Sequence, residues 1–213
     1  MKPIKHLGII TIIFTGFFLL SSCFGLQMDI ALNQNGSGIL SLEYRISKSL
    51  DSIGKLDGNE RWNTIPAGKA DFERTLARLP EMKLLSFSSK EDEKDVIISA
   101  KMEFSSISGL MSFLDASGRR SSFTGNAGGG RLLITLSEGA GINNPDLRKL
   151  IKDISAPYSI NMSMNFQGEG NLEIFDNNGT SLEPQKQGKK LSFSFPLYDV
   201  ISSGDGIKAA FSW

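Results

Sequence analysis

The sequence has very few of the side chains that most often carry out covalent chemistry. Its 213 residues include one histidine, His6, and one cysteine, Cys23. A single cysteine cannot form an intramolecular disulfide. Because both residues lie at the N-terminal end, residues 24–213 contain neither type. That stretch therefore cannot supply Ser-His-Asp or Cys-His catalysis, or a zinc site that needs these ligands.

The chain also lacks an excess of charge of either sign. It contains 23 Lys and Arg residues against 23 Asp and Glu residues. Removing Lys2 and Lys5 with an N-terminal signal leaves 21 basic residues against 23 acidic ones, a formal net charge of −2. Nothing in this balance suggests a general nucleic-acid binder, which needs a basic surface.

The one long hydrophobic run lies at the N-terminus. Residues 1–6 carry Lys2 and Lys5 and no acid, and residues 7–20 (LGIITIIFTGFFLL) are almost wholly apolar. A run of about 14 residues matches the apolar region of a secretory signal peptide and is shorter than the ~20 residues of a membrane-spanning helix. A retained membrane helix is disfavoured because two serines close the run. The segment predicts export.

The end of the run resembles the lipobox of bacterial lipoproteins. Leu20, Ser21 and Ser22 precede Cys23, so an apolar residue and two small ones stand before the only thiol. Small side chains let a peptidase reach the bond between Ser22 and Cys23, and the thiol can receive diacylglycerol as a thioether. We expect cleavage there and a lipid anchor with acyl chains such as palmitate at Cys23, on the extracytoplasmic side of a membrane in the cell envelope. The alternative is an ordinary signal peptide with a chance cysteine.

Removing signal residues 1–22 from 213 leaves 191 residues, which is enough for one hydrophobic core and fits a single domain, residues 23–213. Segments with alternating apolar residues predict strands. They are residues 25–33, 40–46, 82–89, 96–104, 120–124, 132–137, 158–166, 171–175, 191–195 and 207–213.

Apolar residues at helical spacing predict the helices. The three stripes are Phe72, Leu76 and Leu79 after Pro66; Ile107, Leu110, Met111 and Leu114 after a cap near Ser105; and Leu147, Leu150, Ile151 and Ile154 after Asn144-Pro145-Asp146. Short helical turns are expected at 50–56 and 197–202. Strand pairs interrupted by single helices indicate an α+β fold: an antiparallel sheet of hairpins with about three amphipathic helices on one face.

Two loops resemble ligand motifs. Residues 125–130 (GNAGGG) are rich in glycine, but no Gly-Lys-Ser/Thr follows, and a strand stands where a phosphate loop needs a helix. A hairpin connection fits better. Residues 176–180 (DNNGT) have closely spaced oxygen ligands, but Gln187 stands where an EF-hand has its bidentate glutamate. We expect a turn there, and neither a metal nor a cofactor.

Other polar and aromatic groups have both structural and functional interpretations. The carboxylates at 91–93 and Asp95 are interpreted as a solvated turn, since acid-base catalysis would need burial to separate their pKa values. Three lysines at 186, 189 and 190 could meet anionic headgroups but are typical of a surface. Trp62 packs on the adjacent helix or lines a ligand opening, whereas Trp213 is expected in the core. Most of Met162, Met164, Phe166, Phe193 and Phe195 are expected there too.

Both ends of the mature chain resemble the LppM-type domain of bacterial lipoproteins. The start (MDIALNQNGSGILSLEYRIS) is similar to that domain's opening hairpin, and LSFSFPLYDVIS with a strand closing on Trp213 is similar to its end. The resemblance implies an envelope-facing α+β domain with an apolar cavity for lipid or glycolipid, and it implies no catalytic residues. Many relatives are expected to end in a transmembrane helix, which this sequence lacks after Trp213, so the lipid is expected to be the anchor.

These observations predict a non-enzymatic, membrane-anchored envelope lipoprotein. Its domain would bind an apolar ligand, a lipid or glycolipid, or a partner protein that the sequence does not identify. One alternative is a structural or surface-exposed lipoprotein without a small ligand. Another is an enzyme that uses carboxylates or lysine, although no residue spacing in the sequence indicates such an active site.

Overall fold

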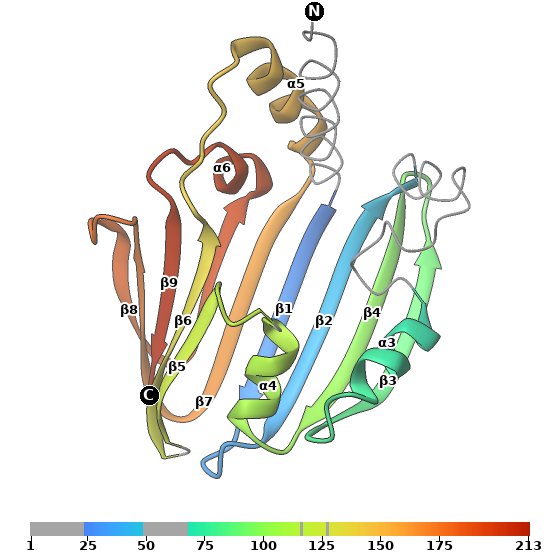
Figure 1. Ribbon diagram of the computed structural model, residues 1–213, viewed down its shortest axis with the longest axis vertical. Coiled ribbons are helices and arrows are strands. Elements are labelled where there is room, and N and C mark those ends of the chain that lie inside the picture. Colours follow the sequence, from blue (N-terminus) through green and yellow to red (C-terminus); the bar gives the residue numbers. More distant parts are fainter. Residues whose placement is uncertain (1–23, 49–67, 116, 127) are drawn as a thin grey trace, which may run out of the picture.

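The computed structural model describes residues 24–48, 68–115, 117–126 and 128–213. Nine strands form one curled sheet in the order β3-β4-β2-β1-β7-β9-β6-β5, with β8 paired to β7 (Figure 1). The bounds are β1 Phe24–Leu32, β2 Gly38–Ser47, β3 Met82–Glu91, β4 Asp95–Phe104, β5 Ser121–Asn126, β6 Gly129–Ser137, β7 Ser159–Phe175, β8 Ser181–Pro196 and β9 Ile207–Ser212. The α+β prediction therefore agrees broadly with a structure that is mostly sheet.

The sheet is mixed, whereas the sequence predicted an antiparallel one. Neighbouring strands pair antiparallel except β1 and β7, which run parallel with Leu26 opposite Ile160 and Leu32 opposite Phe166. The three predicted local hairpins are all present: β1–β2, β3–β4 and β5–β6. The parallel pair joins segments more than a hundred residues apart, and no local pattern could announce it.

The sheet turns a corner within the β7–β8 hairpin. Residues 160–166 of β7 pair with β1, and residues 171–175 pair with β9. The sequence predicted two strands in this region, and the structure joins them through residues 167–170. Pairing with β8 is interrupted between Asn165 and Gly170, and resumes with Gly170 opposite Gly188. A Cβ atom on Gly170 would lie 2.7 Å from the Phe166 ring and 2.9 Å from the Ser212 carbonyl oxygen, so glycine lets the corner close.

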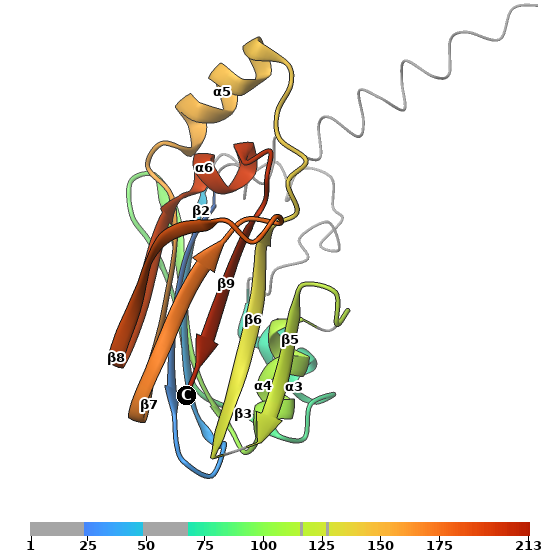
Figure 2. The ribbon, with the colours of Figure 1, turned by 90° about the vertical axis from the view of Figure 1, so that its left-hand side faces the viewer.

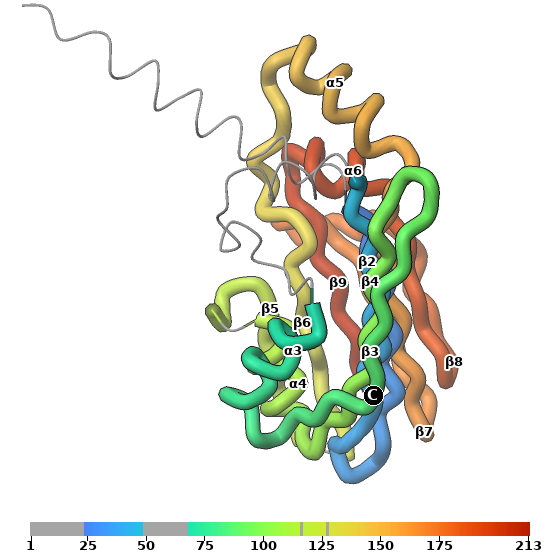
Figure 3. Tube along the Cα trace, turned by 90° about the vertical axis from the view of Figure 1, so that its right-hand side faces the viewer, coloured from blue at the N-terminus to red at the C-terminus, as the bar shows by residue number. Residues whose placement is uncertain are grey.

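Helices α3 (Lys69–Leu76) and α4 (Ile107–Leu114) lie on one face of the sheet (Figures 2 and 3). Phe72, Leu76, Ile107 and Leu110 enter the same core cluster as the inward-facing strand residues. Because α4 contacts both β4 and β5, which stand near opposite ends of the strand order, it holds the curl of the sheet together. The cap of α4 is Ser106, one residue after the predicted position, and its hydroxyl accepts from the Gly109 N–H at 3.1 Å.

Helices α5 (Pro145–Ser155) and α6 (Leu197–Ser202) lie beyond the ends of the strands and contact each other (Figure 1). The Asn144 cap is confirmed, since its side chain accepts from the Asp146 and Leu147 N–H groups. The expectation that α5 packs against the sheet like the other two is wrong: Leu150 is 48% exposed, and only Ile151 of the apolar stripe is fully buried. A helical stripe shows that one face is apolar, and the chain's path decides what covers it.

The core lies between the inward face of the sheet and α3 and α4. Its largest fully buried side chains include Tyr44, Phe72, Phe104, Phe211 and Leu110. Met162, Met164, Phe166 and Phe193 are buried as predicted, and Phe195 is partly buried against them. The opposite face of the first hairpin carries Ser41, Glu43 and Arg45, which alternate with apolar residues along β2.

Candidate ligand cleft

The predicted anchor residues Leu20, Ser21, Ser22 and Cys23 lie outside the described residues, as do Trp62, Pro66 and the short helical pattern at 50–56. What the structure describes begins one residue later. Phe24 is already the first residue of β1 and pairs with Ile46 of β2. A lipid on Cys23 would therefore be joined to the sheet with no intervening linker.

A cleft of about 430 Å³ lies where the sheet turns its corner, at the end of the molecule opposite the start of β1. Leu32 at the end of β1, Phe166 in the β7 bend and Trp213 after β9 provide its apolar lining. Four polar side chains and two glycines complete it: Asn33, Gln34, Gln167, Glu169, Gly128 and Gly168. Its size falls within the range of small-molecule sites, roughly 300–1,000 Å³.

Trp213 is the central aromatic residue of this cleft. Its ring is stacked against Phe123 of β5 and Phe166 of β7, with ring centroids 5.6 and 5.5 Å apart. Backbone bonds to Gly130 in both directions hold Trp213 in place, at 3.0 and 3.1 Å. The indole N–H is buried and has no acceptor among the described residues. Trp213 packs against the core as predicted, and the cleft that it also lines was not predicted.

The polar side of the cleft comes from two bends of the chain. Asn33 closes the β1–β2 turn by donating from its side-chain nitrogen to Ser37 Oγ at 3.0 Å. Gln167 Nε2 donates to Asn33 Oδ1 at 3.4 Å and so joins that turn to the β7 bend. Amide side chains can both donate and accept hydrogen bonds. The cleft thus offers an aromatic surface beside adaptable polar groups, which suits an amphipathic ligand.

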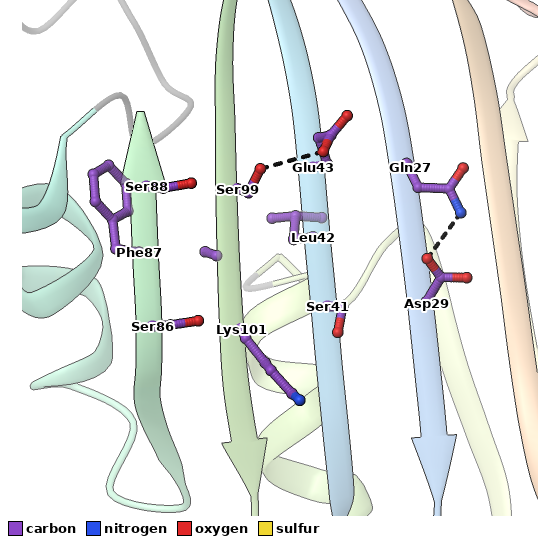
Figure 4. A pocket seen from close by; sticks show the side chains of 11 residues that line it. Gln27, Asp29, Ser41, Leu42, Glu43, Ser86, Phe87, Ser88, Ser99 and Lys101 are labelled. Atoms are coloured by element: carbon purple, nitrogen blue, oxygen red, sulfur yellow. Dashed lines mark hydrogen bonds between the residues drawn. The ribbon is translucent and has the colours of Figure 1, made fainter. Parts of the chain in front are cut away.

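A second, smaller hollow of about 290 Å³ lies on the outward face of β1, β2, β4 and β3 (Figure 4). It exists because short serines stand between longer side chains in cross-strand rows. One row runs through Ser86, Lys101, Ser41, Asp29, Ser163 and Ser192, and the next through Ser88, Ser99, Glu43, Gln27, Asn161 and Ser194.

The two carboxylates of the hollow already have partners. The Asp29 carboxylate accepts hydrogen bonds from Gln27 Nε2 at 2.9 Å and from the Ser163 hydroxyl. Glu43 accepts from Ser99 Oγ at 3.2 Å. Neither hollow is lined by residues of helices α3 or α4. In the described part of the chain, no group of three His, Cys, Asp or Glu side chains could hold a metal ion.

The loops with alternative interpretations are all used structurally. Gly125 and Gly130 face each other within the β5–β6 hairpin. In the 176–180 turn, Asp176 accepts from the Thr180 and Asn178 N–H groups, both at 2.8 Å. These bonds, the one from Thr180 first, lower the pKa of Asp176. Its carboxylate therefore organises the turn.

The carboxylates at 91–95 divide into two environments. Asp92 accepts from the N–H groups of Asp95 and Lys94, which lower its pKa, and it fits the predicted solvated turn. For Asp95 the predicted solvated turn is wrong, because this residue is only 9% exposed and its carboxylate accepts a hydrogen bond from the Tyr158 hydroxyl at 2.8 Å. The partner lies 63 residues away in the sequence, so the local acidic sequence could not reveal this burial.

Lys189 and Lys190 are exposed to solvent on β8, which pairs only with β7 among the described strands. Lys186 instead bonds to Glu183 Oε2 at 2.6 Å and to the Ser192 carbonyl at 3.1 Å. Lysines and Pro184 on a free edge discourage pairing with another chain. This accounts for the cluster without membrane headgroups.

Comparisons with known proteins do not identify a family for this chain. No protein-family model matches the chain, and no curated protein matches it. Among solved structures, the chain is similar to the NMR structure of the folded domain of LppM from Mycobacterium tuberculosis, at 13% identity and a TM-score of 0.46 over 89% of each chain. Among the described residues, no helix is long and apolar enough to span a bilayer.

Proposed function

We propose that this protein is a lipid-anchored, extracytoplasmic binding protein without enzymatic activity, and that its ligand site is the corner cleft beside Trp213. The ligand would be amphipathic: a lipid or glycolipid, or an apolar side chain of a partner protein. The anchor is supported by the lipobox at Leu20, Ser21, Ser22 and Cys23. The absence of histidine and free thiol from the mature sequence supports a non-enzymatic role.

The observation that carries the ligand site is the environment of Trp213. An aromatic ring stacked on both Phe123 and Phe166 gives a rigid apolar surface, and such surfaces contribute strongly to binding at a low cost in conformational entropy. Its buried N–H without an acceptor costs roughly 1–3 kcal/mol in the free protein. A ligand oxygen that reached it would recover part of that cost.

The position of the cleft bears on where a ligand comes from. Leu32 lines the cleft and lies eight residues after Phe24, which places it about 26 Å from the start of β1 along an extended strand. An anchor at Cys23 would hold the start of β1 against the membrane. The cleft then opens away from the protein's own bilayer, and we expect it to take a molecule that is presented from outside that bilayer.

Tryptophan fluorescence tests the site. In a Trp62→Phe variant, Trp213 is the only tryptophan. Titration with a short-chain fatty acid and with a lysophospholipid should shift its emission and saturate. Adding Trp213→Leu to an otherwise wild-type chain should abolish uptake of a fluorescent fatty acid.

The matched control is Leu182→Ala, which alters an exposed apolar residue away from the cleft. This variant should take up the fatty acid like the wild type. Unchanged Trp213 emission with every amphiphile, or equal uptake by Trp213→Leu and wild type, would exclude the cleft as a lipid site. The structural lipoprotein would then be the better interpretation.

A further inference from the structure

Helix α5 is an amphipathic helix without a complete apolar partner. Ile151 and Ser155 are each 1% exposed and form its buried side. Leu147 and Ile154 are half-buried and Leu150 is 48% exposed, so the apolar stripe continues from the buried side to the surface. None of the four apolar residues of α5 belongs to the main core cluster. Leu150 is the one exposed member of this stripe, and the partly buried Leu147 and Ile154 lie beside it, so this face of α5 is available for contact.

Helix α5 contacts α6, and side-chain and backbone bonds join it to the segments on either side. Lys152 Nζ stands 5.7 Å from the centre of the Tyr198 ring of α6. Arg148 donates from Nε and Nη2 to the Ile142 carbonyl at 3.1 and 2.6 Å. At the other end, the Leu197 N–H donates to the Tyr158 carbonyl at 2.9 Å. These contacts fix which side of α5 faces α6 and leave Leu150 on the outer side.

The position of α5 selects its partner. The helix stands at the end of the sheet where β1 begins, and it projects beyond the first residue of β1 (Figures 1 and 2). Cys23 precedes Phe24 directly, and Phe24 is already paired with Ile46. A lipid on Cys23 can enter a bilayer only if the membrane surface lies close to the start of β1. An element that projects past that point then meets the headgroup layer.

We infer that α5 is a membrane-contacting helix that inserts Leu150, with Leu147 and Ile154 beside it, into the interfacial layer of the bilayer to which the protein is anchored. The inference rests on the proposed lipid at Cys23. Interfacial helices bury their apolar face ~5–10 Å into the headgroup boundary. One α5 helix with so few exposed apolar residues would not hold the protein there alone, so it orients an anchored domain.

The charges of α5 predict whether its membrane contact depends on anionic lipid. Arg148, Lys149 and Lys152 are nearly balanced by Asp146 and Asp153. On the helix, the two acids lie beside Leu150, whereas Arg148 and Lys152 lie toward the opposite side. Contact should therefore depend on apolar insertion and should not need anionic lipid.

A single-cysteine fluorescence experiment tests this. Lipidation would consume the thiol of Cys23, so Leu150→Cys in the lipidated mature protein carries one free thiol for an environment-sensitive dye. The protein is reconstituted in phosphatidylcholine vesicles that contain a nitroxide-labelled lipid. We expect several-fold stronger quenching of the dye at residue 150 than at two exposed control positions. These are Lys149→Cys on the same helix and Lys83→Cys on β3, at the opposite end of the sheet.

Three outcomes separate the possibilities. If the protein floats with the vesicles but the dye is quenched weakly and equally at all three positions, the inference is overturned and the anchor remains supported. Failure of the protein to float with vesicles would overturn the anchor itself. A dye at residue 150 that is shielded equally in detergent micelles and in vesicles, without nitroxide quenching, would show that this chain or a second copy of it covers the residue, and would also overturn the inference.

Discussion

Two buried tyrosines show how the same residue type can cost or contribute stability. Tyr44 is 1% exposed, and its hydroxyl has no hydrogen-bond partner among the described residues. Burial, with a smaller contribution from Asp71, raises the pKa of this phenol. Tyr158 is also buried, but its hydroxyl donates to the Asp95 carboxylate. Both side chains are buried, and they differ in whether the hydroxyl has a hydrogen-bond acceptor.

The matched substitutions Tyr44→Phe and Tyr158→Phe should therefore have opposite consequences. Removing an unsatisfied hydroxyl should leave the free energy of unfolding unchanged or raise it, whereas Tyr158→Phe leaves Asp95 without its donor and should lower it by about 1–3 kcal/mol. Urea unfolding of the two variants and the wild type measures both. A Tyr44→Phe variant as destabilised as Tyr158→Phe would mean that the Tyr44 hydroxyl has a partner after all.

A second pair of residues tests the two kinds of helix in the fold. Leu110 of α4 is 1% exposed inside the main core, whereas Leu150 of α5 is 48% exposed. Leu110→Ala should lower the free energy of unfolding by about 2–5 kcal/mol through the cavity it leaves. Leu150→Ala in the soluble domain should change it by less than about 0.5 kcal/mol. Thermal unfolding of both variants measures this difference. Similar losses of stability in the two variants would show that Leu150 is packed as tightly as Leu110.

At the scale of elements, the connection between α4 and β5 depends on one carboxylate. Asp115 accepts hydrogen bonds from the Ser117 hydroxyl and from the Ser117, Arg120 and Ser121 N–H groups. These bonds, led by the one from the Ser117 hydroxyl, hold the pKa of Asp115 well below its usual range. The loop brings β5 into position beside Trp213, so the carboxylate also supports the cleft.

The sign of the pH dependence follows from that lowered pKa. A carboxyl whose pKa is lower in the folded state than in the unfolded state, where it is about 3.9, stabilises the fold above pH ~4. That contribution is lost as the pH falls through the folded-state value. Asp115→Asn should therefore be less stable than the wild type at pH 7, and the difference should shrink at pH 2–3. Unfolding curves at both pH values test this, and a difference that stayed constant would assign the effect to the loop's shape.

The corner in the β7–β8 hairpin is the other element that positions the cleft. It brings Phe166 and Gln167 beside the end of β1 and the end of β9, which come from opposite ends of the mature chain. The alternating pattern around it predicted two separate strands, because Gly168 and Gly170 interrupt the apolar period. Those same glycines were the signal that the chain bends there.

At the scale of the whole molecule, the anchor proposed at Cys23 would join the end of β1 opposite the cleft. The lipid would hold one end of the sheet on a membrane, and the cleft at the other end would face the space beyond it. If both proposals hold, the cleft would take up a ligand from that space and would not extract lipid from the adjacent bilayer. This arrangement also separates the membrane contact proposed for α5 from the ligand site proposed at Trp213.

The anchor itself is tested by Cys23→Ala. This substitution removes the only thiol, so fatty-acid labelling should disappear and the protein should leave the membrane fraction or accumulate as uncleaved precursor. Labelling with a radioactive or clickable palmitate, followed by membrane fractionation, measures both. A Ser22→Ala variant keeps a small residue before the cysteine and should be labelled normally. Undiminished labelling of Cys23→Ala would show that the lipid, if any, is attached elsewhere.

The sequence by itself determined the features that depend on neighbouring residues. The local hairpins, the stripes of α3 and α4, the Asn144 cap and the short helix at 197–202 all follow from periodicity, turn residues and capping groups. The lipobox is likewise a local pattern, and it predicts the anchor without any knowledge of the fold. Only the tertiary structure decided which faces are covered and which distant residues meet. The parallel β1–β7 pair, the exposure of Leu150, the burial of Asp95 by Tyr158 and the cleft around Trp213 all join segments far apart in the chain. Local sequence carries each residue's polarity, but which residues become neighbours depends on the path of the whole chain.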